Sequence, residues 1–278
     1  MTFGPRSPWI KPGGFCPRAA SAATRLYLLA AAATAGCAED GPERRPLRVF
    51  AASSLTDAFR DMETAFEAAY PDTDVGLVFA GSQVLRLQIE RGAGADVFAS
   101  ADRRHLASLE RAGLLSGYRR FAGNELALIV PPGNPAEIGS FADLPRAERL
   151  VIGTEHVPLG AYTREALRRA GGRLGAEFES EVLGRVVSWE SSARLVRAKV
   201  ELGVADAAIV YRTDVAPGKV RALPVPPEAN VRANYLMGAV AGAANPEGAA
   251  HWLGFVASPA GREILVRRGF VAVAAAGR

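Results

Sequence analysis

Cysteine is almost absent from this chain of 278 residues, which has only Cys16 and Cys37. Both lie within its first 37 residues, so the remainder of the sequence carries no thiol. This excludes disulfide bonds and thiolate metal sites from that remainder. Hydrophobic residues make up 49% of the chain. We therefore expect a folded domain that is held together by its core alone.

An excess of positive charge is also absent once the N-terminal segment is set aside. The chain has a formal net charge of +4, but residues 1–36 carry four basic residues and no acidic one. Without them, 29 basic residues face 29 acidic residues. Nucleic-acid binding draws most of its affinity from basic side chains that neutralise phosphates. We therefore expect no nucleic-acid partner.

Most motifs of enzymes are missing as well. The sequence contains no nucleotide-binding glycine loop, no H-E-x-x-H zinc motif and no G-x-S-x-G nucleophile elbow. Only three histidines occur, and His156 lies beside Glu155 in a loop. That pair leaves one enzyme alternative open from the residues alone, a secreted serine hydrolase that uses His156.

Residues 1–36 have the pattern of a secretory signal peptide. Arg25 precedes an apolar run that is too short to span a membrane, and small residues follow it. Two cleavage sites compete, an A-x-A site that ends at Ala35 and a lipobox-like TAGC that ends at Cys37. We expect a lipid on Cys37 and a polar tether over 37–46.

From Leu47 onward, short apolar runs alternate with segments of helical periodicity. This order is typical of an α/β protein with mainly parallel sheets flanked by helices. The expected strands are 47–52, 74–80, 95–100, 124–132, 149–153, 206–211, 219–225 and 234–242. The expected helices are 55–69, 82–92, 102–112, 160–171, 191–203, 246–258 and 259–268.

Three of the expected helices follow a strand through small, hydroxyl or glycine residues, at Ser53-Ser54, at Gly81-Ser82 and in the loop 155–162. Helix starts carry unsatisfied N–H groups and a partial positive charge. Several that converge would bind an anion without Lys or Arg. Simple capping is the alternative for each, and Ser54 with Asp57 approximates a capping box.

Five segments resemble the periplasmic molybdate-binding protein family of bacterial ABC importers. They are VFAASSLTDAF (49–59), FAGSQVLRLQIERGAGADVFASAD (79–102), GTEHVPLGAYTREAL (153–167), AAIVYRTDV (207–215) and GREILVRRGF (261–270). The resemblance covers nearly all of 47–272. It implies a two-lobed type II periplasmic binding protein fold with the ligand cleft between the lobes. Lobe 1 is expected over 47–125 plus 235–278, and lobe 2 over 126–234.

The resemblance also implies which residues contact the ligand, a tetrahedral oxyanion. The hydroxyl groups of Ser54, Ser82 and Tyr211 are expected to donate to it. Backbone N–H groups are expected to donate at Leu159 and Ala193. Ser54 is expected both to cap its helix and to donate to the ligand.

The function implied by the resemblance is capture of molybdate, and of tungstate, for a membrane permease. Such a protein performs no chemistry, needs no cofactor and ligates no metal cation directly. We expect a monomer at the periplasmic or extracellular face of the cytoplasmic membrane, in contact with it only through a lipid anchor. Another oxyanion, such as sulfate, remains open. Phosphate usually carries a proton at neutral pH, and no carboxylate acceptor lies next to Ser54, Ser82 or Tyr211 in the sequence.

Overall fold

The computed structural model describes residues 44–273. The expected signal peptide, 1–36, and the expected lipid site, Cys37, lie outside the described residues. Within 44–273, none of the helices combines the length and the apolar character needed to cross a membrane.

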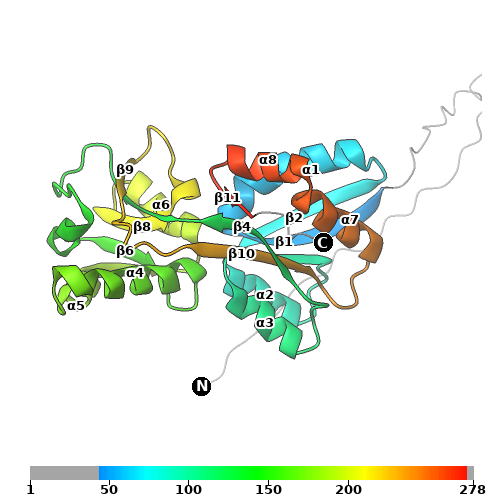
Figure 1. Ribbon diagram of the computed structural model, residues 1–278, viewed down its shortest axis with the longest axis horizontal. Helices are drawn as coiled ribbons and strands as arrows, with labels where there is room; N and C mark the ends of the chain where they lie inside the picture. The colour runs from blue at the N-terminus through cyan, green and yellow to red at the C-terminus, as the bar shows by residue number, and fades with distance from the viewer. Residues whose placement is uncertain (1–43, 274–278) are drawn as a thin grey trace, which may run out of the picture. The chain divides into compact units, whose positions relative to one another are not determined.

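Lobe 1, as we use the term from here, is built on a six-stranded sheet in the order β11-β4-β10-β3-β1-β2. Its strands are β1 (Arg45–Ala52), β2 (Thr73–Ala80), β3 (Val97–Ser100), β4 (Arg119–Asn124), β10 (Ala233–Ala239) and β11 (Val271–Ala272). Its helices are α1 (Thr56–Ala69), α2 (Ser82–Glu90), α3 (Arg103–Arg111), α7 (Pro246–Ala257) and α8 (Pro259–Arg267), with a 3-10 turn, η1 (Ser53–Leu55), before α1. Figure 1 shows α1, α7 and α8 on one face of this sheet and α2 and α3 on the other.

The alternation of side chains along β1 explains these two layers. Val49 belongs to the core beneath α1 and α7, whereas its neighbour Phe50 belongs to a second cluster beneath α2 and α3. Successive strand residues point to opposite faces, so a strand of continuous apolar residues needs helices on both sides. On the α1 side, the ring of Trp252 packs edge-on against Phe59 and Phe66.

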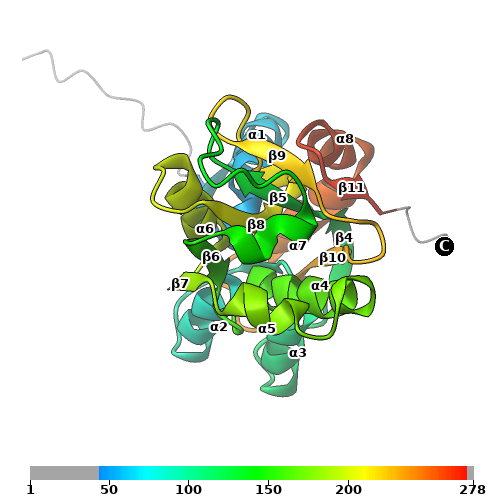
Figure 2. The ribbon, with the colours of Figure 1, turned by 90° about the vertical axis from the view of Figure 1, so that its left-hand side faces the viewer.

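Lobe 2 is built on a five-stranded sheet in the order β7-β6-β8-β5-β9. Its strands are β5 (Leu126–Val130), β6 (Leu150–Gly153), β7 (Val186–Glu190), β8 (Ala207–Tyr211) and β9 (Arg221–Pro224). Its helices are α4 (Pro158–Leu174), α5 (Phe178–Leu183) and α6 (Ala193–Glu201), with the 3-10 segments η2 (Phe141–Arg146) and η3 (Arg212–Asp214). In Figure 2 this sheet lies between α6 and the pair α4 and α5.

The two-lobed α/β fold is confirmed, but both sheets are mixed rather than mainly parallel. The pairs β1–β2, β1–β3, β6–β7 and β6–β8 are parallel. The remaining pairs, which involve β4, β5, β9, β10 and β11, are antiparallel. The β-α units of each lobe give the parallel part, as their pattern predicted. The antiparallel part arises where the chain passes between the lobes and returns.

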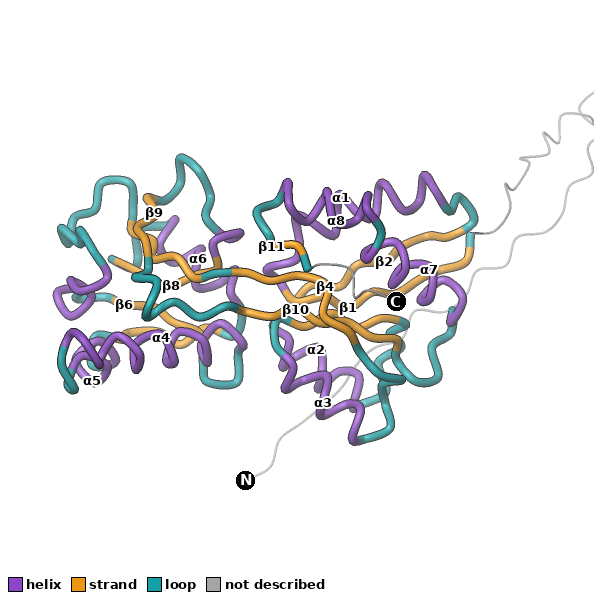
Figure 3. The backbone as a smooth tube through the Cα atoms, viewed as in Figure 1, coloured by secondary structure: helices purple, strands orange, loops and turns teal. Residues whose placement is uncertain are grey.

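The chain crosses between the lobes twice, from β4 to β5 and from β9 to β10, and the strands β4 and β10 at these crossings lie side by side in Figure 3. The first crossing is Glu125, between β4 and β5, and the second is 225–232, between β9 and β10. The amide of Asn230 joins them, because its Oδ1 accepts from the N–H of Leu126 at 3.0 Å and its Nδ2 donates to the Leu126 carbonyl at 3.1 Å. These paired crossings are where a hinge between the lobes would bend.

Candidate ligand-binding site

Four helical segments begin around one small cavity, each just after a strand. The segments η1 and α2 come from lobe 1, and α4 and α6 come from lobe 2. The lining residues are Ala52, Ser53, Ser54, Gly81, Ser82, Ala101, Val157, Pro158, Leu159, Ala193 and Tyr211. All of the residues that the sequence suggested as ligand contacts therefore lie on the wall of a single cavity between the lobes.

Among the described residues, 44–273, those that line this cavity include no charged side chain. The first turns of the helices provide partial positive charge instead, because their N–H groups lack intrahelical acceptors. Leu159 is the second residue of α4, and Ala193 is the first residue of α6. The backbone N–H groups of both residues therefore belong to first turns at the cavity wall. This arrangement favours an anion.

The cavity is tight in this closed arrangement of the lobes. Its volume is only about 10 Å³. That is room for roughly one water molecule. A larger ligand therefore needs the lobes to move apart before it can enter, and to settle slightly further apart once it is inside.

Tyr211 carries a hydroxyl group that is buried without a partner. Its side chain is 1% exposed, and its Oη forms no hydrogen bond. Burial raises the pKa of Tyr211 well above its ordinary value, so the hydroxyl keeps its proton at neutral pH. Leaving such a donor unsatisfied costs about 1–3 kcal/mol. An acceptor inside the cavity would remove that cost.

Ser54 is oriented by a residue that the sequence did not suggest, Tyr235 of β10. The two hydroxyl oxygens lie 2.8 Å apart. Either hydroxyl can be the donor of this bond, and Asn124 Nδ2 also donates to Tyr235 Oη at 3.5 Å. When Tyr235 donates to Ser54, the proton of Ser54 is available to the cavity. Tyr235 lies in an apolar strand with no motif around it, so no signal in the sequence pointed to it.

The expectation that Ser54 caps its helix is wrong. The 3-10 turn η1 intervenes between β1 and α1, so the N-cap position of α1 is Leu55, which has no capping side chain. Thr56 instead donates its hydroxyl to the Ser53 carbonyl at 2.6 Å. The hydroxyl of Ser54 is thereby left for Tyr235 and the cavity.

Ser82, the first residue of α2, is 1% exposed. Its Oγ accepts the N–H of Ala101 at 3.3 Å, so its own proton is free to donate into the cavity. Its neighbour Gly81 lets the backbone of lobe 1 come close to the backbone of lobe 2. A Cβ at Gly81 would overlap the backbone oxygen of Ser191, so glycine at this position lets the lobes meet.

The residues of the hydrolase alternative lie apart from this arrangement. The side chains of Glu155 and His156 are 69% and 77% exposed, and their closest approach is 3.8 Å. None of the hydrogen bonds within residues 44–273 joins the His156 ring to a serine. Nor do those residues contain a group of three or more His, Cys, Asp or Glu that could hold a metal ion.

A larger hollow of about 590 Å³ lies on lobe 1, between the end of α1 and the start of α7. Its lining includes Asp72 and Glu247 as well as Arg45 and His251. The two carboxylates disfavour an anion there. The small cavity between the lobes is therefore the better candidate for an anion site.

The comparison with known proteins agrees with this geometry. A family model described as bacterial extracellular solute-binding protein matches residues 47–271. The chain belongs to this family. A relative from Mycobacterium tuberculosis (strain ATCC 25618 / H37Rv), named molybdate-binding protein ModA, is 37% identical over 230 residues. The match covers 81% of this chain and 84% of the relative.

Solved structures of solute-binding proteins share the fold. The sulfate-binding protein SubI from Mycobacterium tuberculosis H37Rv has a TM-score of 0.75 at 18% identity, covering 84% of this chain and 88% of that chain. The periplasmic molybdate-binding protein of Azotobacter vinelandii has a TM-score of 0.69 at 17% identity, covering 82% and 99%. At these identities the likeness supports the two-lobed fold and does not identify the ligand.

Proposed function

We propose that this solute-binding protein captures molybdate outside the cytoplasm and delivers it to the membrane permease of an ABC importer. One observation carries the proposal. Hydroxyl groups and helix starts from both lobes converge on a single cavity whose lining has no charged side chain. The identity of 37% to a molybdate-binding relative supports molybdate as the particular anion.

The donor set fits an oxyanion without protons. Ser54, Ser82 and Tyr211 offer O–H groups, and Leu159 and Ala193 offer N–H groups. A fully deprotonated tetrahedral dianion accepts hydrogen bonds at every oxygen, so each of these donors has a partner. Phosphate usually keeps a proton at neutral pH and needs an acceptor, but no carboxylate lines the cavity. Tungstate has the shape and charge of molybdate, and we propose that it binds as well.

Sulfate is the alternative ligand. It has the same charge and shape, and a sulfate-binding protein shares this fold. Its bonds from sulfur to oxygen are shorter than those of molybdate, so at the lobe separation that suits molybdate it reaches the donors of both lobes less well. The two hypotheses therefore differ in the expected selectivity between sulfate and molybdate.

The mechanism is closure of the lobes around the ligand. Ser54 and Ser82 belong to lobe 1, whereas Leu159, Ala193 and Tyr211 belong to lobe 2. A ligand that bonds to both sets binds the closed form best and shifts the population toward it. No bond within the ligand is made or broken, and no cofactor takes part. Opening at the paired crossings then releases the oxyanion to the permease.

Thermal unfolding in the presence of oxyanions tests this function. A ligand at a hundredfold excess over Kd stabilises the folded state by about 2.7 kcal/mol. For a protein of this size we expect Tm to rise by about 5 °C or more with molybdate. Sodium chloride at the same ionic strength should leave Tm nearly unchanged. Equal shifts with both salts would indicate general screening and would contradict a specific site.

We also propose that a lipid on Cys37 holds the protein at the outer face of the cytoplasmic membrane, as a monomer. The TAGC segment, together with the polar residues after it, supports the lipid anchor. Replacing Cys37 by serine should release the protein into the soluble fraction of the same cells. An unmodified N-terminus at Gly36, found by mass spectrometry of the wild-type protein, would contradict lipidation.

A further inference from the structure

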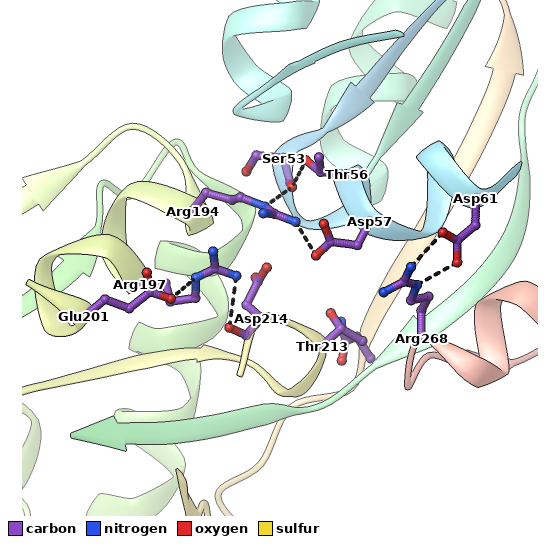
Figure 4. Close-up of polar contacts among 11 residues, drawn as sticks. Ser53, Thr56, Asp57, Asp61, Arg194, Arg197, Glu201, Thr213, Asp214 and Arg268 are labelled. Atoms are coloured by element: carbon purple, nitrogen blue, oxygen red, sulfur yellow. Dashed lines mark hydrogen bonds and ion pairs between the residues drawn. The ribbon is translucent and has the colours of Figure 1, made fainter. Parts of the chain in front are cut away.

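One arginine joins the two walls of the cleft. Arg194 lies on α6 in lobe 2, directly after Ala193 of the cavity wall. Its Nη2 lies 2.6 Å from Asp57 Oδ2, and its Nε donates to the Ser53 carbonyl at 3.1 Å. Asp57 and Ser53 belong to lobe 1, and Ser53 also lines the cavity. Figure 4 shows this side chain reaching from α6 to both partners.

A buried carboxyl group lies on the other side of Arg194. Asp214, in η3 of lobe 2, is 1% exposed, and its Oδ2 forms no hydrogen bond. In Figure 4 this carboxyl group points toward the side of α6 that carries Arg194 and Arg197. Arg197 is already engaged, because its Nε pairs with Glu201 Oε1 at 2.8 Å and its Nη1 donates to the backbone oxygen of Asp214. Both arginines act on the carboxyl group of Asp214, but Arg194 is the one whose present carboxylate partner, Asp57, lies in the other lobe.

We propose that Arg194 is the latch of the cleft and that Asp214 competes for it. The guanidinium group pairs with Asp57 when the lobes are closed and moves to Asp214 when they separate. The balance between the two carboxylates then sets how tightly the closed cleft holds its oxyanion. This inference rests on the proposed function only in assuming that the lobes open and close.

The topology explains why the exchange is favourable. Opening carries Asp57 and Ser53 away from Arg194, because they belong to the other lobe. Asp214 stays within the lobe of Arg194 during any such movement. A buried carboxylate without a partner is unfavourable, so a guanidinium group released from lobe 1 gains by turning to it. Neither charge need remain unpaired in the open form.

Protonation of Asp214 links the latch to pH. Burial raises its pKa to about 6 in the closed form, while Arg194 and Arg197 oppose this and Asp57 adds to it. The other groups that face Asp214 are the hydroxyls of Tyr211 and Tyr235, whose own pKa values burial raises well above the ordinary range. Pairing with Arg194 in the open form would lower the pKa of Asp214 again.

The sign of the pH effect follows from that difference. The closed form is favoured most at low pH, where Asp214 is neutral, and this preference is lost as pH rises through about 6. With an ordinary value of 3.8 for the open form, the affinity for molybdate should be about fourfold higher at pH 5.5 than at pH 8. The hydroxyl and amide donors of the cavity do not titrate in this interval, so they contribute no slope.

Calorimetry on the full chain with molybdate tests the latch. Arg194→Gln removes the two contacts that this side chain makes across the cleft and should raise Kd about five- to tenfold through faster release. Arg268→Gln is the matched control, because Arg268 pairs with Asp61 at 2.6 and 2.7 Å within lobe 1. It should change Kd less than twofold. Equal values of Kd for the two variants would overturn the role of Arg194.

A second variant tests the role of Asp214. Asp214→Asn cannot attract the guanidinium group as a charge, so it should bind molybdate about a hundredfold more tightly than the wild-type protein at pH 8. Its affinity should also be flat between pH 5.5 and pH 8. A variant that keeps the slope of the wild-type protein would overturn the role of Asp214.

Hydrogen exchange without any ligand separates this inference from the proposed function. In Arg194→Gln, peptides that cover 50–60 and 190–200 should exchange severalfold faster than in the wild-type protein and in Arg268→Gln. This result would support the latch even if molybdate were not the ligand. Identical exchange in Arg194→Gln and Arg268→Gln would refute the latch even if molybdate bound tightly.

Discussion

The hydroxyl groups of Ser54 and Tyr235 lie 2.8 Å apart and join the cavity wall to a strand that leads from one lobe to the other. Tyr235 is fully buried in β10, and it accepts from Asn124 at the end of β4. Both strands continue into the crossings between the lobes. The orientation of one candidate ligand donor therefore depends on the two strands that lead into the crossings.

Replacing Tyr235 by phenylalanine tests this dependence. The variant keeps the ring in its packing but leaves Ser54 without the hydroxyl that orients it. We expect molybdate affinity to fall about three- to tenfold, or roughly 0.7–1.4 kcal/mol. Tyr118→Phe is the control, since Tyr118 accepts from Arg103 away from the cavity. Calorimetry that gave the same Kd for both variants would remove Tyr235 from the site.

Replacing Tyr211 by phenylalanine should change binding and stability in opposite directions. The variant loses a donor to the oxyanion, so molybdate binding should weaken by about 1.5–3 kcal/mol. Without ligand it loses a buried hydroxyl that has no partner, so its free energy of unfolding should rise by about 1–3 kcal/mol. Ser82→Ala should weaken binding similarly without that gain. A less stable Tyr211→Phe protein with unchanged affinity would show that the hydroxyl faces something other than a ligand.

Gly81→Ala should impair closure of the lobes without impairing folding. The backbone of Gly81 has φ −62° and ψ 139°, which alanine adopts without strain. The added Cβ would nevertheless overlap the Ser191 carbonyl when the lobes meet. We expect unfolding without ligand to change little and molybdate affinity to fall at least tenfold. Gly133→Ala, where a Cβ meets nothing within 4 Å, is the control. If Gly81→Ala bound molybdate with the affinity of the wild-type protein, the lobes of the bound form would lie further apart at Gly81 and Ser191 than they do in this structure.

The buried carboxyl group of Asp214 predicts a pH dependence of stability. Its pKa is raised from 3.8 to about 6 in the folded protein, mainly by burial. Below pH 3.8, Asp214 is protonated in both the folded and the unfolded state and does not change the free energy of unfolding. As pH rises through about 6, the folded protein loses stability because the carboxyl group ionises less readily when it is buried than when the chain is unfolded. Asp214→Asn should raise the free energy of unfolding by about 2–3 kcal/mol at pH 8 and leave it unchanged near pH 4. Denaturant unfolding at both pH values measures this, and an equal effect at both would contradict it.

Asp61 provides the opposite case for the same experiment. Its hydrogen bond to Arg268 lowers its pKa, so its contribution is present at neutral pH and is lost as pH falls. Asp61→Asn should therefore destabilise the protein at pH 8 and have less effect near pH 4. If both asparagine variants changed the free energy of unfolding in the same direction at pH 8, the opposite pKa shifts of Asp61 and Asp214 would be contradicted.

The sequence predicted the order of strands and helices well where apolar runs and helical periodicity are strong. It missed β7, because Val186–Glu190 includes Ser188 and Glu190 and lies at a half-exposed sheet edge. It missed β4 for a related reason, since Arg119 and Arg120 begin that strand and face solvent. Burial by distant parts of the chain, rather than local pattern, makes these segments strands.

The positions of the candidate ligand contacts followed from the resemblance to the molybdate-binding family, while the patterns at strand–helix junctions pointed by themselves only to Ser53-Ser54, Gly81-Ser82 and the loop 155–162. Their partners did not, because the contacts are remote in sequence. Ser54 meets a tyrosine 181 residues away, and Asp57 meets an arginine 137 residues away. The sequence instead suggested that Asp57 completes a local capping box with Ser54. The neighbouring lobe provides the stronger partner, since Arg194 offers a full charge and two donors.

Calorimetry with a panel of oxyanions tests whether the cavity selects molybdate. Molybdate, tungstate, sulfate and phosphate are titrated into the full chain at the same ionic strength and at pH 7.5. We expect molybdate and tungstate to bind at least tenfold more tightly than sulfate, a difference of about 1.4 kcal/mol or more. We also expect weaker binding of phosphate, whose proton would face a donor. Sulfate that matched molybdate, or no binding of either ion, would contradict capture of molybdate at this cavity.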